Sequence, residues 1–313
     1  MKRIGAVVIA GAMLVALAGP AHAYTFTRTL SPGDKGPDVK VLQVRVAGWF
    51  PQSGQEQMPI DGSYGDGTTA AVQAFQSFYG LEPDGIAGPS TFAVIDGLED
   101  DNGSTLHFDW REFKQNRNSN CSAKANGYAG TFKGGMVAPR RTKKNVKRLM
   151  WRLEAMRAKA GGKMVAINSG YRSVAYNDCI GGARASQHMY GTAADNRMAE
   201  VTNRVHRDLA RVSQFHGIGC YSSLSHNHFD LRLENAHLEG ARFWWWPDQD
   251  EKGRDLADDG KPCWGESTAK PADDGSGDGS TRTTGTSRAP LVPSVSFLSV
   301  FESSPEWYQG LGD

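Results

Sequence analysis

Two short segments of the chain carry side chains of the types that bind metal ions. In the first, His188 and Asp195 are seven positions apart, and small residues lie between them. In the second, His226 and His228 alternate with other residues as in a β-strand. Neighbouring side chains of a strand point to opposite faces, so the two histidines should share one polar face, opposite Phe229. Either segment alone is a weak signal, but together they predict a metal site.

The donor types favour zinc over other metal ions. His188, Asp195 and one histidine of the second segment would supply three ligands and leave a fourth tetrahedral position for water. That arrangement is typical of a catalytic rather than a structural zinc site. Nitrogen and oxygen donors suit zinc better than copper or an iron–sulfur centre, and the histidines disfavour calcium. We therefore expect one catalytic zinc ion.

Two helices and two strands are expected to hold these segments in place. Apolar residues at helical spacing over 146–156 predict a helix that ends at two consecutive glycines. Residues 163–168 and 226–233 have the pattern of strands, and residues 200–214 fit a second helix. Basic residues crowd the first helix, and we interpret them as a solvated face: Arg140, Arg141, Lys143, Lys144, Lys147, Arg148 and Arg152.

The first 23 residues have the features of a signal peptide. Lys2 and Arg3 precede an apolar run that ends at Leu17, and residues 21–23 have the small-x-small pattern of a cleavage site. The run is shorter than a membrane span of about 20 residues, so we expect an exported chain with no span after cleavage.

Removing two of the 35 basic residues leaves 33 against 34 acidic ones, a net charge of −1. This balance argues against a nucleic-acid partner.

Length and composition indicate a folded chain of more than one domain. The 313 residues, 39% of them hydrophobic, exceed what one core usually organises, so we expect two domains plus appendages. Residues 270–290 lack large aliphatic and aromatic side chains and cannot offset the entropy of ordering. Four cysteines in an exported chain predict two disulfides, with three possible connectivities.

An internal repeat marks the first domain. The pattern D-G-x-x-G-x-x-T-x-A begins at Asp61 and again at Asp84, an offset of 23. In each copy the glycines permit a tight turn and the threonine is placed to cap a helix. Apolar residues at helical spacing lie between the copies and in an earlier segment, over 39–49. The pattern predicts a small module of three helices.

This repeat resembles the peptidoglycan-binding domain of many bacterial wall hydrolases. The resemblance rests on G-D-K-G-P-D-V at residues 33–39, on the two turn motifs, and on A-V-Q-A-F-Q at residues 71–76. It covers about 70 residues. It implies an all-α module that holds glycan or stem peptide and does no chemistry.

The second domain resembles the zinc peptidases that share a fold with lysostaphin-type enzymes and the hedgehog signalling domain, specifically their D-alanyl-D-alanine carboxypeptidase branch. The resemblance rests on S-x-H-x-x-G-x-A-x-D from Ser186, on the His226-x-His228 pair, and on S-G-Y-R-S from Ser169. It spans residues 107–246. It implies a multidomain chain in which the helical module precedes an α+β peptidase domain with an antiparallel sheet.

The resemblance also assigns roles to individual residues. It implies that the zinc ligands are His188, Asp195 and His228, that the catalytic partner beside the metal is His226, and that Arg172 holds the terminal carboxylate of the substrate or the developing oxyanion. One subgroup of the family has a glutamate base where this chain has Ser225, so the acid–base work falls on His226. Ser186 and Tyr171 are candidate substrate contacts, although a turn cap and a packing residue are the alternatives.

By this resemblance the protein is a secreted, wall-associated zinc carboxypeptidase that hydrolyses the C-terminal D-alanine of peptidoglycan stem peptides. Two alternatives stay open: an endopeptidase that cuts cross-bridges, and a zinc-containing wall-binding protein without turnover. We expect a monomer, with peptidoglycan as partner.

The predicted segments are a signal peptide (1–23), the peptidoglycan-binding domain (24–98), a linker (99–106), the zinc peptidase domain (107–264), and a low-complexity linker with a short apolar tail (265–313). The favoured disulfides are Cys121–Cys179 and Cys220–Cys263, because each closes a loop within the peptidase region.

Overall fold

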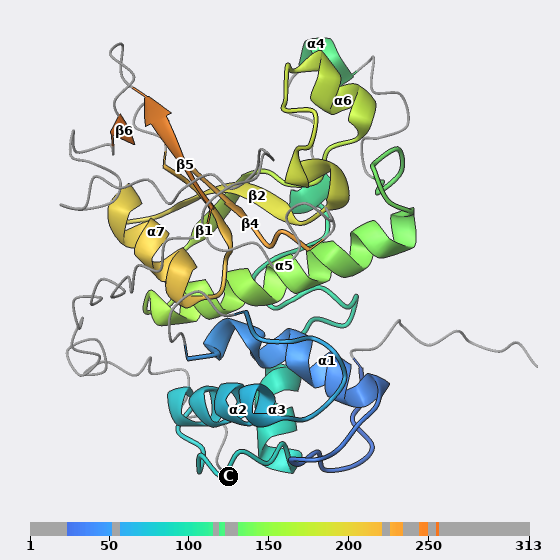
Figure 1. The fold of residues 1–313 in the computed structure, drawn as a ribbon, viewed down its shortest axis with the longest axis vertical. Helices are drawn as coiled ribbons and strands as arrows, with labels where there is room; N and C mark the ends of the chain where they lie inside the picture. The colour runs from blue at the N-terminus through green and yellow to red at the C-terminus, as the bar shows by residue number, and fades with distance from the viewer. Residues whose placement is uncertain are drawn as a thin grey trace, which may run out of the picture.

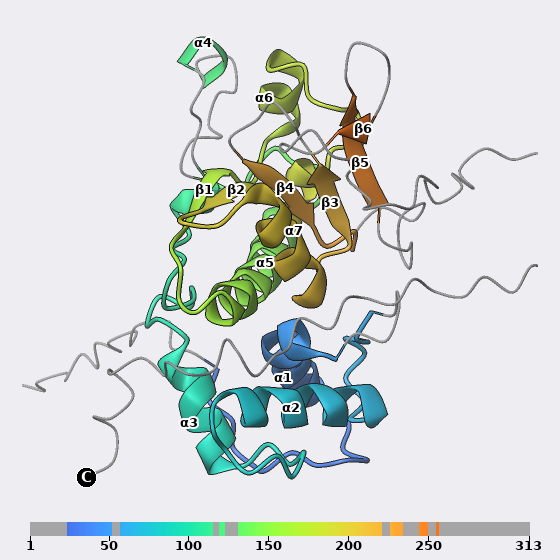
Figure 2. The same cartoon turned by 90° about the vertical axis from the view of Figure 1, so that its left-hand side faces the viewer.

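The computed structural model describes residues 24–51, 57–114, 119–122, 131–220, 226–233, 244–249 and 255–256. The predicted signal peptide and the predicted C-terminal tail lie outside these ranges. In the described part of the chain, no helix has both the length and the apolar character needed to cross a membrane. A helical module lies below a mixed layer of strands and helices (Figures 1 and 2), and the long helix α5 (Pro139–Lys159) runs between the two.

The N-terminal module is built from three α-helices and a short 3-10 turn. These elements are α1 (Pro37–Val46), η1 (Ala47–Trp49), α2 (Asp66–Phe78) and α3 (Pro89–Gly97). The apolar positions that predicted the helices form the core of the module: Val39, Leu42, Val46, Trp49, Ala71, Val72 and Phe75. The prediction of a small three-helix module is confirmed.

The sequence repeat corresponds to a repeated hydrogen-bond arrangement around a buried glutamine. The Gln43 amide donates to Asp61, to the Ser63 carbonyl and to the Thr68 hydroxyl, each at 3.0 Å, and its oxygen accepts from the Gly62 N–H at 2.8 Å. In the second copy, Gln76 makes the equivalent bonds to Asp84, the Ile86 carbonyl, Thr91 and the Gly85 N–H.

The repeat therefore stabilises two tight turns. Gly62 and Gly85 have φ values of +88° and +73°, the left-handed region that glycine tolerates best. The expected capping role of the threonines is wrong, because the N-cap positions of α2 and α3 are glycines without side-chain caps. Thr68 and Thr91 are buried and instead accept hydrogen bonds from the two glutamines.

The second domain is an α+β fold around one sheet. Its elements in chain order are η2 (Glu112–Lys114), α4 (Ser119–Ser122), α5, β1 (Val165–Ser169), α6 (Val174–Cys179), η3 (Gln187–Tyr190), β2 (Ala193–Met198), α7 (Asn203–Val212), β3 (Gly217–Cys220), β4 (Asn227–Asp230), β5 (Trp244–Gln249) and β6 (Asp255–Leu256). The strand order is β1-β2-β4-β3-β5-β6. The four strands β1, β2, β4 and β3 are antiparallel, as predicted, whereas β5 pairs with β3 in parallel.

The predicted elements lie close to the observed ones. The predicted strands at 163–168 and 226–233 correspond to β1 and β4, and the predicted helix at 200–214 corresponds to α7. A disulfide joins Cys121 to Cys179 and ties α4 to α6, which confirms one predicted pair. Cys263, the predicted partner of Cys220, lies outside the described residues.

Helix α5 has two buried faces, which is why it lies between the two domains (Figure 2). Leu149, Leu153 and Met156 pack in the core of the second domain. Trp151 and Ala155, from the other side of the same helix, belong to the apolar core of the N-terminal module. The two domains therefore share one helix as packing surface.

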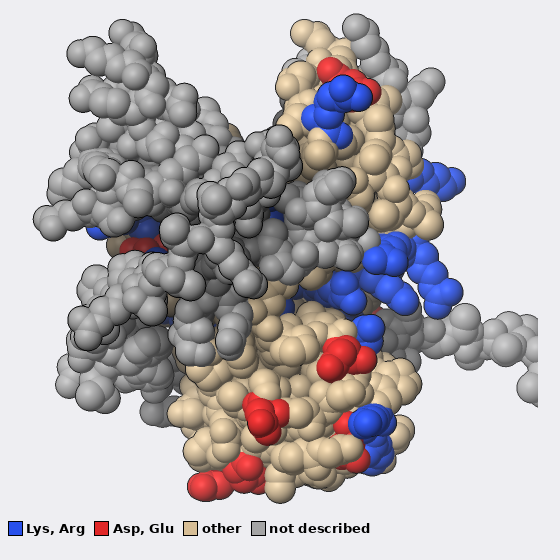
Figure 3. Space-filling model, in the orientation of Figure 1, with Lys and Arg blue, Asp and Glu red and all other residues tan. Residues whose placement is uncertain are grey.

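The expectation that all the basic residues of this helix are solvated is wrong in part. Arg140, Arg141, Lys143 and Lys144, near its beginning, are exposed. Lys and Arg side chains gather on the surface at the level of α5 (Figure 3). Arg152, in contrast, is only 5% exposed, and Lys147 pairs with Glu99. These two positions face the module rather than solvent, because α5 is covered on that side.

The predicted linker, residues 99–106, is a packed turn. An antiparallel bridge joins Glu99 to Thr105, and both residues are buried. The Glu99 carboxylate accepts from the Arg45 guanidinium of α1 at 2.5 Å and from the Lys147 ammonium of α5. Burial lowers the pKa of Arg45, and the charge of Glu99 opposes that shift. This ion network thus joins the module, the turn and α5.

We predict that Glu99→Gln lowers the free energy of unfolding by about 3 kcal/mol or more, because it leaves the buried Arg45 without its counter-charge. Urea unfolding monitored by tryptophan fluorescence measures this change. The matched control is Glu82→Gln, an exposed carboxylate of the same module, which should change the free energy by no more than about 0.5 kcal/mol. Equal losses in the two variants would contradict the role of the network.

Candidate metal centre

Three elements bring the predicted ligands to one point. His188 lies in the short helix η3, Asp195 in β2 and His228 in β4. The antiparallel register places Asp195 directly opposite His228, so these two side chains share one face of the sheet. The turn after η3 carries His188 to the same face. The two segments that the sequence singled out therefore meet through strand pairing.

The donor atoms of the three side chains are mutual neighbours. The Asp195 Oδ1 atom lies 3.1 Å from His188 Nε2 and 2.9 Å from His228 Nδ1, and the two imidazole nitrogens are 3.1 Å apart. All three residues are less than 10% exposed. This is the group of candidate metal ligands found in the described residues.

The remaining nitrogen of each imidazole has its own acceptor. His188 Nδ1 lies 2.6 Å from the Gly170 carbonyl, and His228 Nε2 lies 3.2 Å from the Asp230 carboxylate. When these two nitrogens carry the ring protons, His188 Nε2 and His228 Nδ1 present lone pairs toward each other and toward Asp195. Second hydrogen bonds of this kind are the usual way in which proteins fix metal-binding histidines.

The cluster fits one tetrahedral zinc ion. Zinc binds imidazole and carboxylate donors at about 2.0–2.2 Å, which puts neighbouring tetrahedral ligands about 3.3 Å apart. The three separations of 2.9–3.1 Å are close to that value. Three buried lone pairs at such short range repel one another unless a proton or a metal ion lies between them. The donor chemistry and the spacing therefore both favour a divalent ion with three protein ligands.

The protonation behaviour of the three groups is strongly coupled. Burial would raise the pKa of Asp195, but the charges and hydrogen bonds of His188 and His228 hold it well below its usual range. Burial, helped by the Arg172 charge, lowers the pKa of His188 to about 4. Burial acts in the same direction on His228, but its bonds to Asp195 and Asp230 prevail and raise the pKa to about 9. Without a metal, the cluster thus holds a proton on His228 at neutral pH.

A glycine allows the chain to turn between His188 and β2. Gly191 has a φ of +73°, and a Cβ atom there would lie 2.9 Å from Thr142 Cγ2 and 3.0 Å from the Thr142 carbonyl of α5. Only glycine fits this turn without strain or displacement of the helix. The sequence motif therefore needs Gly191 for close packing of the site against α5.

Arg172 lies beside the cluster and contacts a ligand. Its Nη2 group donates to Asp195 Oδ2 at 2.5 Å, and its Nε donates to the Ser169 hydroxyl at 2.9 Å. Its backbone N–H donates to the His188 carbonyl at 3.1 Å. The guanidinium thus donates a hydrogen bond to Oδ2 of the Asp195 carboxylate, and Oδ1 is the oxygen that would bind the metal.

His226 immediately precedes β4 and is half-buried. Burial lowers its pKa, and the charges of Asp195, His228 and Arg172 act on it as well. The imidazole thus feels the charges of two of the three candidate ligands, Asp195 and His228, and of Arg172. His226 is therefore close to the candidate metal site without being one of the three converging donors.

The two candidate substrate contacts differ in their surroundings. Ser186 is partly exposed just before η3, and its carbonyl accepts from the Met189 N–H. Tyr171 is 1% exposed, its hydroxyl donates to the Lys133 carbonyl at 2.7 Å, and its ring packs edge-on against Phe132. The structure therefore gives Tyr171 a packing role, the alternative considered from the sequence.

Sequence reasoning missed the groups that orient the ligands. Asp230 is completely buried, and it contacts His228 from the same strand. The Gly170 carbonyl holds His188, and Ser169 holds Arg172. Asp230 could have been found, because residues two apart on a strand share a face. The two contacts from the end of β1 depend on a register shift between Ile167 and Ser169, which no sequence pattern reveals.

Two families match different parts of the chain. Residues 123–230 match the family described as Peptidase M15, and residues 35–95 match the peptidoglycan binding domain. The first match contains the three candidate ligands, and the second contains both copies of the repeat. The two matches correspond to the peptidase-like domain and to the helical module.

Several known proteins are similar to this chain. The zinc D-Ala-D-Ala carboxypeptidase of Streptomyces albus G is 38% identical over 223 residues, which cover 71% of this chain and 80% of that protein. The N-acetylmuramoyl-L-alanine amidase CwlL of Bacillus licheniformis is 40% identical over 70 residues, 22% of this chain and 19% of the amidase. A crystal structure of a peptidoglycan-binding protein from Clostridioides difficile, in complex with glutamine hydroxamate, has 35% identity, covers 23% of this chain and 42% of that one, and gives a TM-score of 0.20.

We predict that Asp230→Asn weakens zinc binding by about 10- to 100-fold, the usual effect of losing the partner of a metal-binding histidine. Titration of the metal-free protein with zinc, in competition with a chromogenic chelator, measures this affinity. The control is Asp208→Asn on the exposed face of α7, which should bind zinc like the unmodified protein. Unchanged affinity in Asp230→Asn would contradict the orienting role.

Proposed function

The chain belongs to the Peptidase M15 family, and we propose that it is a secreted zinc D-Ala-D-Ala carboxypeptidase that hydrolyses the C-terminal D-alanine of peptidoglycan stem peptides. The observation that carries this proposal is the convergence of His188, Asp195 and His228 within 3.1 Å of one another. The alignment with the zinc D-Ala-D-Ala carboxypeptidase of Streptomyces albus G covers 80% of that protein.

The three converging side chains are proposed to hold the zinc ion. Bound there, zinc supplies Lewis acidity that polarises a peptide carbonyl and acidifies a water molecule. The chain contributes the orientation of each donor: the Gly170 carbonyl fixes His188, Asp230 fixes His228, and Arg172 fixes the Asp195 carboxylate. Preorganised ligands of this kind avoid the energetic cost of reorganising the site during the reaction.

His226 is proposed as the acid–base partner. Because burial lowers its pKa, the imidazole is neutral at pH 7 and has one nitrogen that can accept a proton. The imidazole is only half-buried, which leaves a side by which a substrate can approach it. In this proposal His226 takes a proton from the attacking water and later returns one to the leaving amine.

Arg172 is proposed to bind the terminal carboxylate of the substrate as well as to orient Asp195. Its Nε and Nη2 groups are used within the protein, and among the described residues no hydrogen bond from Nη1 is found. A guanidinium presents five donors in a fixed plane, so one edge can serve Asp195 while Nη1 faces the substrate. Only a carboxypeptidase substrate has a free C-terminal carboxylate next to the bond that is cut. Binding of this carboxylate by Arg172 would therefore favour carboxypeptidase over endopeptidase action.

The helical module is proposed to bind the wall polymer and to keep the peptidase domain near its substrate. This follows from its match to the peptidoglycan binding domain and from the polar surface turns of the repeat. The proposal keeps the predicted boundaries, with a signal peptide before residue 24 and a secreted, wall-associated monomer as the mature form. The Cys220–Cys263 pair also stays a proposal.

Product identification tests the function. The purified zinc-loaded protein should release free D-alanine from an uncross-linked pentapeptide stem and leave cross-linked dimers intact. Conversion of dimers to monomers without release of D-alanine would favour the endopeptidase alternative. No hydrolysis of either substrate by a zinc-loaded protein would favour the wall-binding alternative without turnover.

We predict that His226→Ala retains zinc but loses about 100- to 10,000-fold in kcat, the range expected when a general acid–base group is removed. His228→Ala, in contrast, should lose the metal itself, because it removes one of the three donors. Metal analysis after gel filtration and D-alanine release, measured on the same samples, separate the two effects. Full activity in His226→Ala would contradict its assigned role.

A further inference from the structure

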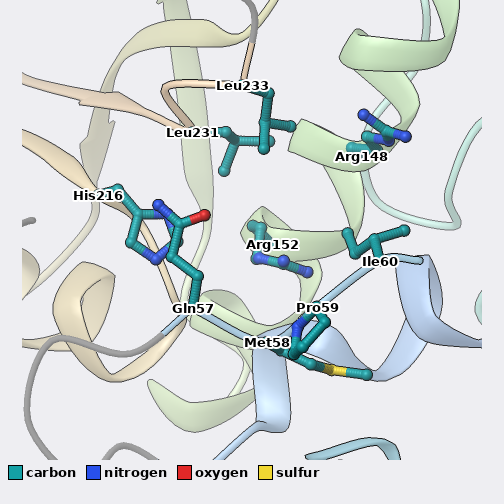
Figure 4. Close-up of a pocket in the computed structure, with 9 residues that line it drawn as sticks. All are labelled: Gln57, Met58, Pro59, Ile60, Arg148, Arg152, His216, Leu231 and Leu233. Carbon is teal, nitrogen blue, oxygen red and sulfur yellow. The ribbon is translucent and has the colours of Figure 1, made fainter. Parts of the chain in front are cut away.

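A cavity of about 220 Å³ lies where the N-terminal module meets the peptidase domain (Figure 4). The segment Met58 to Ile60 of the module forms one side, and Leu231, three residues after the ligand His228, forms part of the other. Arg152 of α5 points into the space between them. The cavity is separate from the three metal-binding side chains, none of which lines it.

Arg152 is a buried cation for which the described residues supply no counter-charge. It is 5% exposed, and its Nε and Nη1 groups are buried with no hydrogen-bond partner. Burial lowers its pKa to about 9, and the nearby charge of Arg148 adds to that effect. Burying guanidinium donors that have no acceptors is unfavourable, because their solvation by water is lost and nothing replaces it. The described part of the site therefore supplies no anion.

A second donor faces the same cavity. Gln57 Nε2 is buried and has no hydrogen-bond partner. Among the described residues that line the cavity there is no aspartate or glutamate, and the two charged side chains are Arg148 and Arg152. The polar groups thus offer hydrogen-bond donors and positive charge, whereas the remaining walls are mainly apolar.

We propose that this cavity is a binding site for a small carboxylate with an apolar body. The carboxylate would accept from Arg152 and from the Gln57 amide, and its hydrocarbon part would contact the apolar walls at Met58, Ile60 and Leu231. A carboxylate offers about four acceptor positions, which match the planar fork of a guanidinium. Water molecules, which occupy about 30 Å³ each, would fill the volume but leave the positive charge uncompensated.

The ligand would bridge the two domains. Gln57 and Met58 belong to the module side, whereas Arg152 and Leu231 belong to the peptidase domain. Binding of the ligand should therefore stabilise the packing of the two domains against each other, to which α5 already contributes. This inference does not depend on zinc or on the proposed hydrolysis.

Methyl NMR of the zinc-loaded full chain, labelled with carbon-13 at the methionine methyl groups, tests the site with isovalerate as the probe. Met58 lines the cavity, and Met189 follows the ligand His188, so the two methyl signals distinguish cavity binding from binding at the metal. We expect a saturable shift of the Met58 signal and none of the Met189 signal. Leucine substitutions of each methionine assign the signals.

The controls separate charge recognition from simple filling of an apolar space. Isoamyl alcohol, the neutral counterpart of the probe, should bind at least about tenfold more weakly, as expected for a lost charge-assisted hydrogen bond. Arg152→Met should abolish the saturable shift, whereas Arg140→Met, at an exposed site on the same helix, should leave it unchanged. Gln57→Leu, which leaves α5 unchanged, should weaken isovalerate binding severalfold. This variant tests the site if Arg152→Met does not fold.

The melting temperature gives an independent measurement. Isovalerate should raise the melting temperature of the unmodified protein but not that of Arg152→Met. Three results would overturn the proposal: a Met58 signal that never shifts, equal affinity for the acid and the alcohol, or binding that survives both Arg152→Met and Gln57→Leu.

Discussion

The candidate metal site depends on the close approach of three buried donor atoms. Asp195 Oδ1, His188 Nε2 and His228 Nδ1 lie within 3.1 Å of one another, which is unfavourable for lone pairs unless a proton or a metal ion lies between them. Strand pairing between β2 and β4 imposes one of the three contacts, and the turn at Gly191 imposes the others. The Gly170 carbonyl and Asp230 then hold each ring in the orientation that keeps the donors pointed inward. The rest of the peptidase domain supports this geometry.

The two domains are not independent units in this structure, because the long helix α5 contributes to the cores of both. Its Leu149 side packs on the sheet, while Trp151 and Ala155 complete the core of the helical module. The turn that follows α3 is fixed to the same helix by Glu99. Wall recognition and hydrolysis are therefore proposed to occur in one packed unit, in which a bound wall segment and the metal site keep a set separation.

Local patterns predicted the parts of the structure that depend on local chemistry. Helical spacing found the core of the module, and the His-x-His alternation found β4, because periodicity reports directly on which face is buried. The ligand set followed from residue type together with family resemblance. Strand β2 was not predicted, since A-A-D-N-R-M lacks the alternation of a half-buried strand: both faces of it are covered. The burial of Arg152 and the contact between Glu99 and Lys147 arise from the docking of distant segments, which no local pattern encodes.

The two buried arginines at the domain junction have contrasting surroundings. Arg45 and Arg152 are both about 95% or more buried, and both lie where α5 meets the module. Arg45 has the carboxylate of Glu99 at 2.5 Å, so its charge is neutralised within the protein. Arg152 has no acidic partner among the residues that the structure describes, although the methylene groups of a methionine would fill a similar volume without the cost of a buried charge. The free energy of unfolding of a domain is only about 5–15 kcal/mol, so a buried guanidinium without a counter-charge lowers the stability by a considerable fraction of it. The proposed carboxylate would give Arg152 the counter-charge that Glu99 gives Arg45.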